Sequence, residues 1–173
     1  MKRVISVLLI LLLLFSAYGC AGSNRDLEVP ASFYYRADPV TYNTPTSIFS
    51  AEVRETADLN NNTLEILNRY VAGPASVGYL SPFPAGVSVD SIKRDGERVI
   101  ITMNDAFGTL TGVGLTAACT CVTLTVTELI GCQEVVIQCE SVSLDGATSI
   151  AMNIANLHFM DTTDITPQVS EQQ

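Results

Sequence analysis

The stretch "TAACTCVTLTVTEL", residues 116–129, decides the fold because it fits two kinds of secondary structure. The apolar side chains at positions 122, 124 and 126 alternate as they do in a strand. A helical spacing covers a longer run and gathers one apolar face: Leu115, Ala118, Cys119, Val122, Val126 and Leu129. The threonines at 116, 120, 123 and 127 then form a polar face. The longer repeat favours a helix that begins at Thr111, or at the glycines after it, and ends at Gly131.

The N-terminus has the pattern of an export signal. Lys2 and Arg3 supply positive charge, residues 4–15 form an almost unbroken apolar run, and small residues follow. The run is short for a membrane span and ends as a cleavage site does. Cys20 is the expected lipid-attachment residue of a lipoprotein, although Ala17 stands where leucine is usual; simple cleavage is the alternative. The mature chain is therefore expected outside the cytoplasm, anchored by lipid to the outer face of the cell membrane.

The composition indicates one folded, acidic domain. The chain has 173 residues, of which 47% are hydrophobic and 16% charged, enough apolar material for a packed core. The formal net charge is −9, and it becomes −11 when Lys2 and Arg3 leave with the signal. Such a chain lacks the basic surface by which proteins bind nucleic acid, so no nucleic-acid partner is expected.

A helix over residues 112–130 restricts the chemistry of its cysteines. Residues two apart on a helix point about 200° from one another, so Cys119 faces the core and Cys121 faces elsewhere. These two thiols cannot share one metal ion, and no second cysteine pair or histidine completes a zinc site. Export permits a disulfide, either Cys121 with Cys132 or Cys132 with Cys139. We expect no metal and no cofactor, and we expect Cys119 and Cys139 to be buried thiols.

The remaining segments predict strands around one further helix. Residues 32–36 and 46–56 are rich in aromatic and β-branched residues and predict two strands. The next helix is expected from an N-cap at Asn62, three residues before Glu65, to Gly73, where Pro74 prevents continuation. Asp95-Gly96 predicts a hairpin between strands at 87–92 and 98–103. Alternating apolar residues at 150–154 predict an edge strand, and residues 161–173 look disordered.

The order of these features resembles the GerMN domain of GerM-like sporulation and spore-germination lipoproteins. The segments that carry the resemblance are Gly73-Pro74, Pro84-Ala85-Gly86, Asp95-Gly96, Ile101 to Phe107, Thr123-Leu124-Thr125 and the strand 134–139. The resemblance covers residues 45–146 and implies an α+β domain with two helices packed on one face of a mixed β-sheet. We therefore expect a lipoprotein-type export signal at 1–20, a tether at 21–31, a GerMN-like domain at 32–146 and a partly disordered tail at 147–173.

The resemblance implies a non-catalytic protein that contributes to sporulation or spore germination. Its expected partner is another envelope component, either a protein complex or peptidoglycan, and the alternative function is a cell-wall glycan-binding module that assists peptidoglycan remodelling. A sheet edge or the aromatic residues Phe33, Tyr34 and Tyr35 are the predicted contact, with burial in the core as the alternative. The sequence shows no G-x-S-x-G nucleophile, and its one histidine, His158, lies in the tail, so no enzyme is expected.

Overall fold

The computed structural model describes residues 29–38, 49–56 and 59–157, and their strands form two sheets. The first sheet is antiparallel, in the order β2 (Phe49–Thr56), β1 (Val29–Ala37) and β3 (Tyr79–Leu80). The second has the order β4 (Val89–Asp95), β5 (Arg98–Met103), β6 (Glu134–Cys139) and β7 (Ser149–Asn153). The predicted export signal, most of the predicted tether, His158 and the predicted disordered tail lie outside the described residues.

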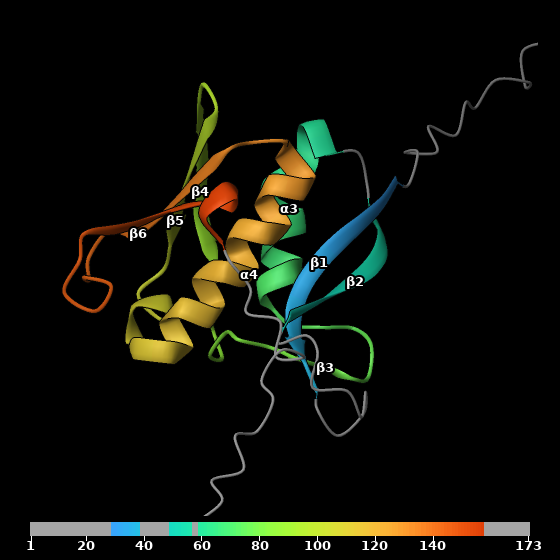
Figure 1. Ribbon diagram of the computed structural model, residues 1–173, viewed down its shortest axis with the longest axis horizontal. Helices are drawn as coiled ribbons and strands as arrows, with labels where there is room; N and C mark the ends of the chain where they lie inside the picture. Colours follow the sequence, from blue (N-terminus) through green and yellow to red (C-terminus); the bar gives the residue numbers. More distant parts are fainter. Residues whose placement is uncertain (1–28, 39–48, 57–58, 158–173) are drawn as a thin grey trace, which may run out of the picture.

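Two helices, α3 (Leu59–Val71) and α4 (Gly112–Ile130), lie between these sheets (Figure 1). The α+β class and the two helices are as predicted, but the strands form two sheets where one was expected. Helix α4 connects β5 to β6, which are parallel, so it must cross over one face of the second sheet. Its opposite side packs against β1. The helices thus form a middle layer, and the first sheet covers the side of this layer that faces away from the second sheet.

Helix α4 confirms the helical interpretation of the decisive stretch. Gly131 adopts φ 68° and its N–H donates to the carbonyl of Thr127 at 2.9 Å, which ends the helix where predicted. The N–H of Gly112 donates to the Asp145 carboxylate at 3.2 Å, and Arg94 donates to the carbonyl of Ile130 at 3.0 Å. A negative group at the start and a positive group at the end both match the helix dipole. Arg94 lies in β4 and Asp145 in the segment between β6 and β7, so both ends of α4 are bonded to the second sheet or its connections.

The predicted polar face of α4 is wrong at two of its four threonines, while Thr116 is exposed as expected. Thr120 and Thr123 are buried, as is Thr125, because protein covers the helix on both sides. Among the described residues, α4 is the one helix long and apolar enough to cross a membrane, with a mean hydropathy of 1.6. Its contacts with β1, β6 and β7 instead make it the central core helix.

Helix α3 begins earlier than predicted. It starts at Leu59, so Asn62 lies inside the first turn and is not the N-cap. Asp58, directly before Leu59, is also of a type that caps helices, as are the asparagines at 60–62. The sequence alone therefore does not show which of these residues precedes the helix. Asn68 fixes α3 to β4, because its side chain exchanges two hydrogen bonds of 2.9 and 3.0 Å with the backbone of Val89.

The predicted hairpin is confirmed. Asp95 pairs with Arg98, and Gly96 adopts φ 62° at the first of the two loop positions, where a type II′ turn needs positive φ. Strand β7 is also confirmed at the edge of the second sheet, paired with β6. Since β1 begins at Val29 and β7 ends at Asn153, the folded unit extends beyond both predicted boundaries.

Candidate binding site

Strand β2 carries two of its three charged residues, Glu52 and Arg54, on the inner face. Glu52 is 3% exposed and the Arg54 side chain 19%, whereas Val53 between them is 66% exposed on the outer face. Arg54 Nε donates to the Glu52 carboxylate at 2.6 Å, and Arg54 Nη2 contacts the same carboxylate. A buried charge is costly unless it is paired and hydrogen-bonded, so this ion pair explains how two charges can lie inside.

Glu52 also holds the loop that follows α3. Its carboxylate accepts hydrogen bonds from the backbone N–H of Ala75 at 3.1 Å and of Ser76 at 2.6 Å. Burial raises the pKa of Glu52, but the hydrogen bonds from Ser76, Arg54 and the Ala75 backbone outweigh burial and hold this pKa below its usual value. Glu52 is therefore a structural carboxylate that stays ionised, and it is poorly suited to proton transfer.

Arg54 extends the network to β1 and to the end of α3. Its Nη2 donates to the Tyr35 hydroxyl at 2.7 Å and to the carbonyl of Gly73 at 2.9 Å. The guanidinium carbon lies 5.1 Å from the centre of the Phe33 ring, within cation–π range. Burial raises the pKa of Tyr35 far above its usual value, although Arg54 opposes this shift, so its hydroxyl remains a neutral hydrogen-bonding group. Arg54 is thus held rigidly at this position.

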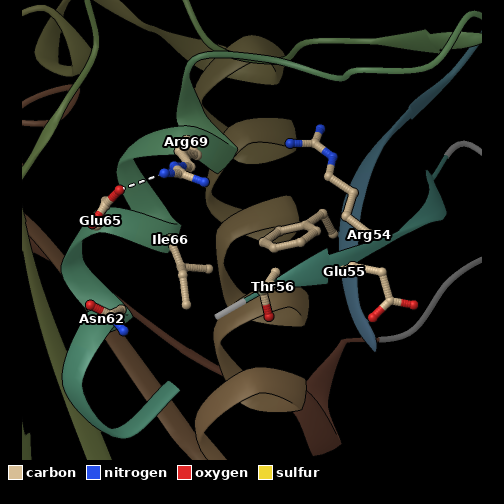
Figure 2. Close-up of a pocket in the computed structure, with 8 residues that line it drawn as sticks. Arg54, Glu55, Thr56, Asn62, Glu65, Ile66 and Arg69 are labelled. Carbon is tan, nitrogen blue, oxygen red and sulfur yellow. Dashed lines mark hydrogen bonds and ion pairs between the residues drawn. The ribbon is translucent and has the colours of Figure 1, made fainter. Parts of the chain in front are cut away.

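A pocket of about 290 Å³ lies between β2 and α3, beside this network (Figure 2). Figure 2 shows Asn62, Glu65, Ile66 and Arg69 on the α3 side of the pocket and Arg54, Glu55 and Thr56 on the β2 side, with the Glu55 carboxylate directed away from α3. Arg69 is paired with Glu65 at 2.6 Å, and both side chains are largely exposed. The complete lining is Phe33, Arg54, Glu55, Thr56, Asn62, Glu65, Ile66 and Arg69. Both arginines of the lining are already paired with a carboxylate, Arg54 with Glu52 and Arg69 with Glu65.

The aromatic residues predicted as a partner contact belong mainly to the core. Phe33 and Tyr35 are 2% and 0% exposed, and both rings pack against Tyr70 of α3. They are therefore not a surface contact; the alternation of β1 turns them inward. Tyr34 is partly buried and faces α4, where Glu128 is a hydrogen-bond partner of its side chain. Burial raises the pKa of Tyr34, and Glu128 raises it further. Only Phe33 also reaches the pocket, as part of its wall.

The sequence matches the Germane family, described as "Sporulation and spore germination", over residues 32–145. The chain belongs to this family. The match spans β1 through β6 and includes both helices, the buried ion pair and every residue that lines the pocket. No curated protein sequence matches the chain.

Solved structures share the fold of this Germane domain. The tandem GerMN domains of the sporulation protein GerM from Bacillus subtilis are 22% identical, with a TM-score of 0.55, covering 76% of this chain and 48% of that one. The first GerMN domain of the same protein is 14% identical, with a TM-score of 0.54, covering 69% of this chain and 91% of that one. The chain therefore spans about half of the tandem structure, and the likeness concerns the fold.

The segments that suggested the Germane family have structural roles here. Gly73-Pro74 ends α3 in the loop that Glu52 and Arg54 hold. Thr125, in the Thr-Leu-Thr segment, accepts a hydrogen bond of 2.9 Å from the backbone N–H of Tyr34. The N–H and carbonyl of Tyr34 point away from β2, and the carbonyl accepts from the Tyr70 hydroxyl at 2.9 Å. The two helices thus satisfy the edge of β1 that no strand covers at this position.

The cysteines of the Germane domain are buried thiols. Burial raises the pKa values of Cys119 and Cys121 each to about 12, and burial raises that of Cys139 as well. Such thiols carry almost no thiolate at neutral pH, and the thiolate is the reactive form. After burial, the pKa of Cys119 is influenced by Cys139 of β6, and that of Cys121 by Arg36 of β1. The two thiols therefore face different sheets, as their spacing on the helix predicted, but both of these surfaces are buried.

The predicted disulfide between Cys121 and Cys132 is not formed in the structure. The Cys132 Sγ lies 3.9 Å from the Thr127 Oγ1, six residues along α4 from Cys121. Six helical residues rise about 9 Å, beyond the Cα separation that a disulfide allows. The alternative pair, Cys132 and Cys139, is also free. Within the described ranges, no three His, Cys, Asp or Glu side chains gather closely enough to hold a metal ion.

Sequence reasoning missed Glu52 and Arg54. Their spacing of two residues in a predicted strand shows that they share a face, and opposite charges on one face can form a pair. Val53, between them, is the apolar residue, so alternation alone does not indicate that the charged face is the buried one. Only the loop after α3, which supplies N–H and carbonyl partners, makes the charged face the inner face.

Proposed function

We propose that this Germane protein is a non-catalytic lipoprotein, anchored to the outer face of the cell membrane, that contributes to sporulation or spore germination by binding another envelope component. The observation that carries this proposal is the family match over residues 32–145, which takes in nearly the whole described domain. The component would be a protein complex or the cell wall. A strain that lacks the gene is expected to form fewer heat-resistant spores or to germinate slowly.

The non-catalytic part of the proposal is supported by the roles of the ionisable groups. Glu52 is the one buried charged residue among those described, and its carboxylate accepts hydrogen bonds from Ser76 and Arg54 that maintain the fold. The thiols are buried, and the charged residues of the pocket include one exposed ion pair, Arg69 with Glu65. General acid–base catalysis needs a group whose pKa is placed near the working pH. The pKa of Glu52 is lowered and those of the Cys119 and Cys121 thiols are raised, both away from neutral pH.

The anchor is supported by the sequence. Eight residues separate Cys20 from Val29, the first residue of β1, so a lipidated Cys20 would hold the domain close to the membrane surface. Labelling with a radioactive or clickable fatty acid is expected to mark the mature chain that begins at Cys20 and to be lost in Cys20→Ala. Retention of the label in Cys20→Ala would contradict lipidation at this residue, and Cys132→Ala is the matched control that should keep the label.

A further inference from the structure

We propose that β7, the edge strand of the second sheet, pairs antiparallel with β7 of a second copy of this chain, so that the sheet continues from one copy into the other. The inference goes beyond the proposed function, because it concerns two copies of this chain. β7 pairs with β6 on one side, and no described strand pairs with its other side. The chain leaves β7 through a short 3₁₀ helix, η2 (Ile154–Asn156), which contacts α4. An unpaired row of backbone N–H and C=O groups is a template for another extended strand.

The other edge strands carry features that discourage such pairing. Charged side chains, bulges and very short strands protect sheet edges from other chains. β2 has three charged residues, β4 has four and a register shift between Val89 and Ser91, and β3 has only two residues. β7, with the sequence SIAMN, has no charged residue, no proline and a regular register against β6. Of the four edges in the described part of the chain, β7 is therefore the one without these features.

The sequence of β7 is self-complementary about its central residue. A two-fold antiparallel pairing places Ala151 opposite Ala151 of the second copy. The same register places Ile150 opposite Met152 and, at the ends of the strand, Ser149 opposite Asn153. Directly opposite residues share a face of the sheet, so apolar residues meet on one face and polar residues on the other. No like charges meet at any position.

Each face of this pairing matches its surroundings. Ile150 and Met152 are partly buried and pack against the hydrophobic core, so their pairing extends the core from one copy to the other. Ser149 and Ala151 are exposed on the opposite face, and the small alanine side chains meet at the centre without a clash. The Asn153 Oδ1 accepts from the N–H of Ala155 at 2.9 Å, which leaves its NH₂ group to donate to the Ser149 hydroxyl.

This self-complementarity identifies the occupant of the edge as a second copy. A two-fold interface uses the same patch on both copies, so every residue must suit its counterpart, and β7 meets this requirement along its length of five residues. So short a pairing forms a small interface, and we expect a weak dimer. The proposed lipid anchor would confine the copies to one membrane surface and raise their local concentration, which favours such a dimer.

Cysteine cross-linking of the full-length chain tests the inference, because the register fixes the distances between the copies. In Ala151→Cys the two introduced residues are directly opposite, with Cα atoms about 5 Å apart, within the range that a disulfide allows. In Ser149→Cys, the matched control in the same strand, an offset of four residues separates them by about 14 Å. Both positions are exposed, so both variants are expected to fold. The native cysteines of the described residues are buried and should not react.

Intact cells that express each variant are oxidised with copper phenanthroline, and the chain is then examined on non-reducing gels. Ala151→Cys is expected to give a reducible band at twice the monomer mass, which Ser149→Cys lacks. Val53→Cys, exposed on β2, controls for chance collisions and should also lack the band. No such band in Ala151→Cys, or bands of equal strength in Ala151→Cys and Ser149→Cys, would overturn the inference. A reducible band that joins the chain to a different protein would overturn it too, because the edge would then belong to another partner.

The failure of this inference and the failure of the proposed function give different results. Absence of the cross-link would overturn the pairing of β7 alone, since the role in spores is measured by the deletion strain. A deletion strain without a spore defect, combined with the expected cross-link, would overturn the sporulation role alone.

Discussion

Glu52→Ala is expected to lower the free energy of unfolding by about 3–5 kcal/mol, the usual cost of removing one partner of a buried ion pair. Arg54 would keep its charge in a largely buried position without its carboxylate, and the N–H groups of Ala75 and Ser76 would lose their acceptor. Urea unfolding followed by circular dichroism measures the change. Glu65→Ala is the matched control, since it also removes a glutamate paired with an arginine, but on the surface, and it should cost less than about 1 kcal/mol. Equal effects of the two substitutions would contradict the structural role of Glu52.

The same carboxylate predicts a dependence of stability on pH. The pKa of Glu52 is lower in the folded chain than its ordinary value, so its contribution is fully present above the ordinary glutamate pKa of about 4.3 and is lost as the pH falls through the folded pKa. Glu52→Gln, which keeps the shape without the charge, should lower stability near neutral pH and lose less stability than the wild type on acidification. Parallel stability curves for the two proteins would contradict this assignment.

Thr125→Val is expected to lower the free energy of unfolding by about 1–3 kcal/mol, the cost of leaving a buried polar group unsatisfied. The Thr125 hydroxyl accepts from the backbone N–H of Tyr34 and is also a hydrogen-bond partner of the Tyr70 side chain. Valine has nearly the same shape but no hydroxyl, so both interactions are lost while the packing is kept. Thermal and urea unfolding measure the effect.

Thr123→Val is the internal control for this prediction. Thr123 is also fully buried on α4, but its hydroxyl has no hydrogen-bond partner among the described residues. Replacing an unsatisfied buried hydroxyl with a methyl group should leave stability unchanged or raise it slightly. Equal destabilisation by the two substitutions would show that the hydroxyl of Thr125 has no special role in holding β1 against α4.

The elements that the sequence predicted well depend on nearby residues. Gly131 ends α4 and Gly96 forms the hairpin because each supplies a positive φ within a few residues of the element it shapes. The errors arose where distant segments decide. Thr120 and Cys121 were expected to lie off the core face, and they are buried because β1 covers that side of α4. No periodicity along a helix can show that a second sheet packs on its far side.

The candidate site was less predictable than the fold. Glu52 and Arg54 lie two residues apart in a strand that the sequence does predict, but the direction of their face depends on the loop after α3. The pocket lies between that strand and α3, and its lining comes from residues of both elements. The aromatic residues of β1 were correctly placed in a strand, yet which of them face inward follows from its pairing with β2 and its packing on Tyr70.

The most direct measurement is the yield of heat-resistant spores, together with their germination rate, in a spore-forming host from which the gene has been deleted. The deletion strain is expected to fall below its parent in one or both measurements, and the wild-type gene is expected to restore them. The Cys20→Ala gene, whose product would lack the lipid anchor, should restore them poorly. A deletion strain that sporulates and germinates as its parent does would contradict a role of this Germane protein in spore formation or germination.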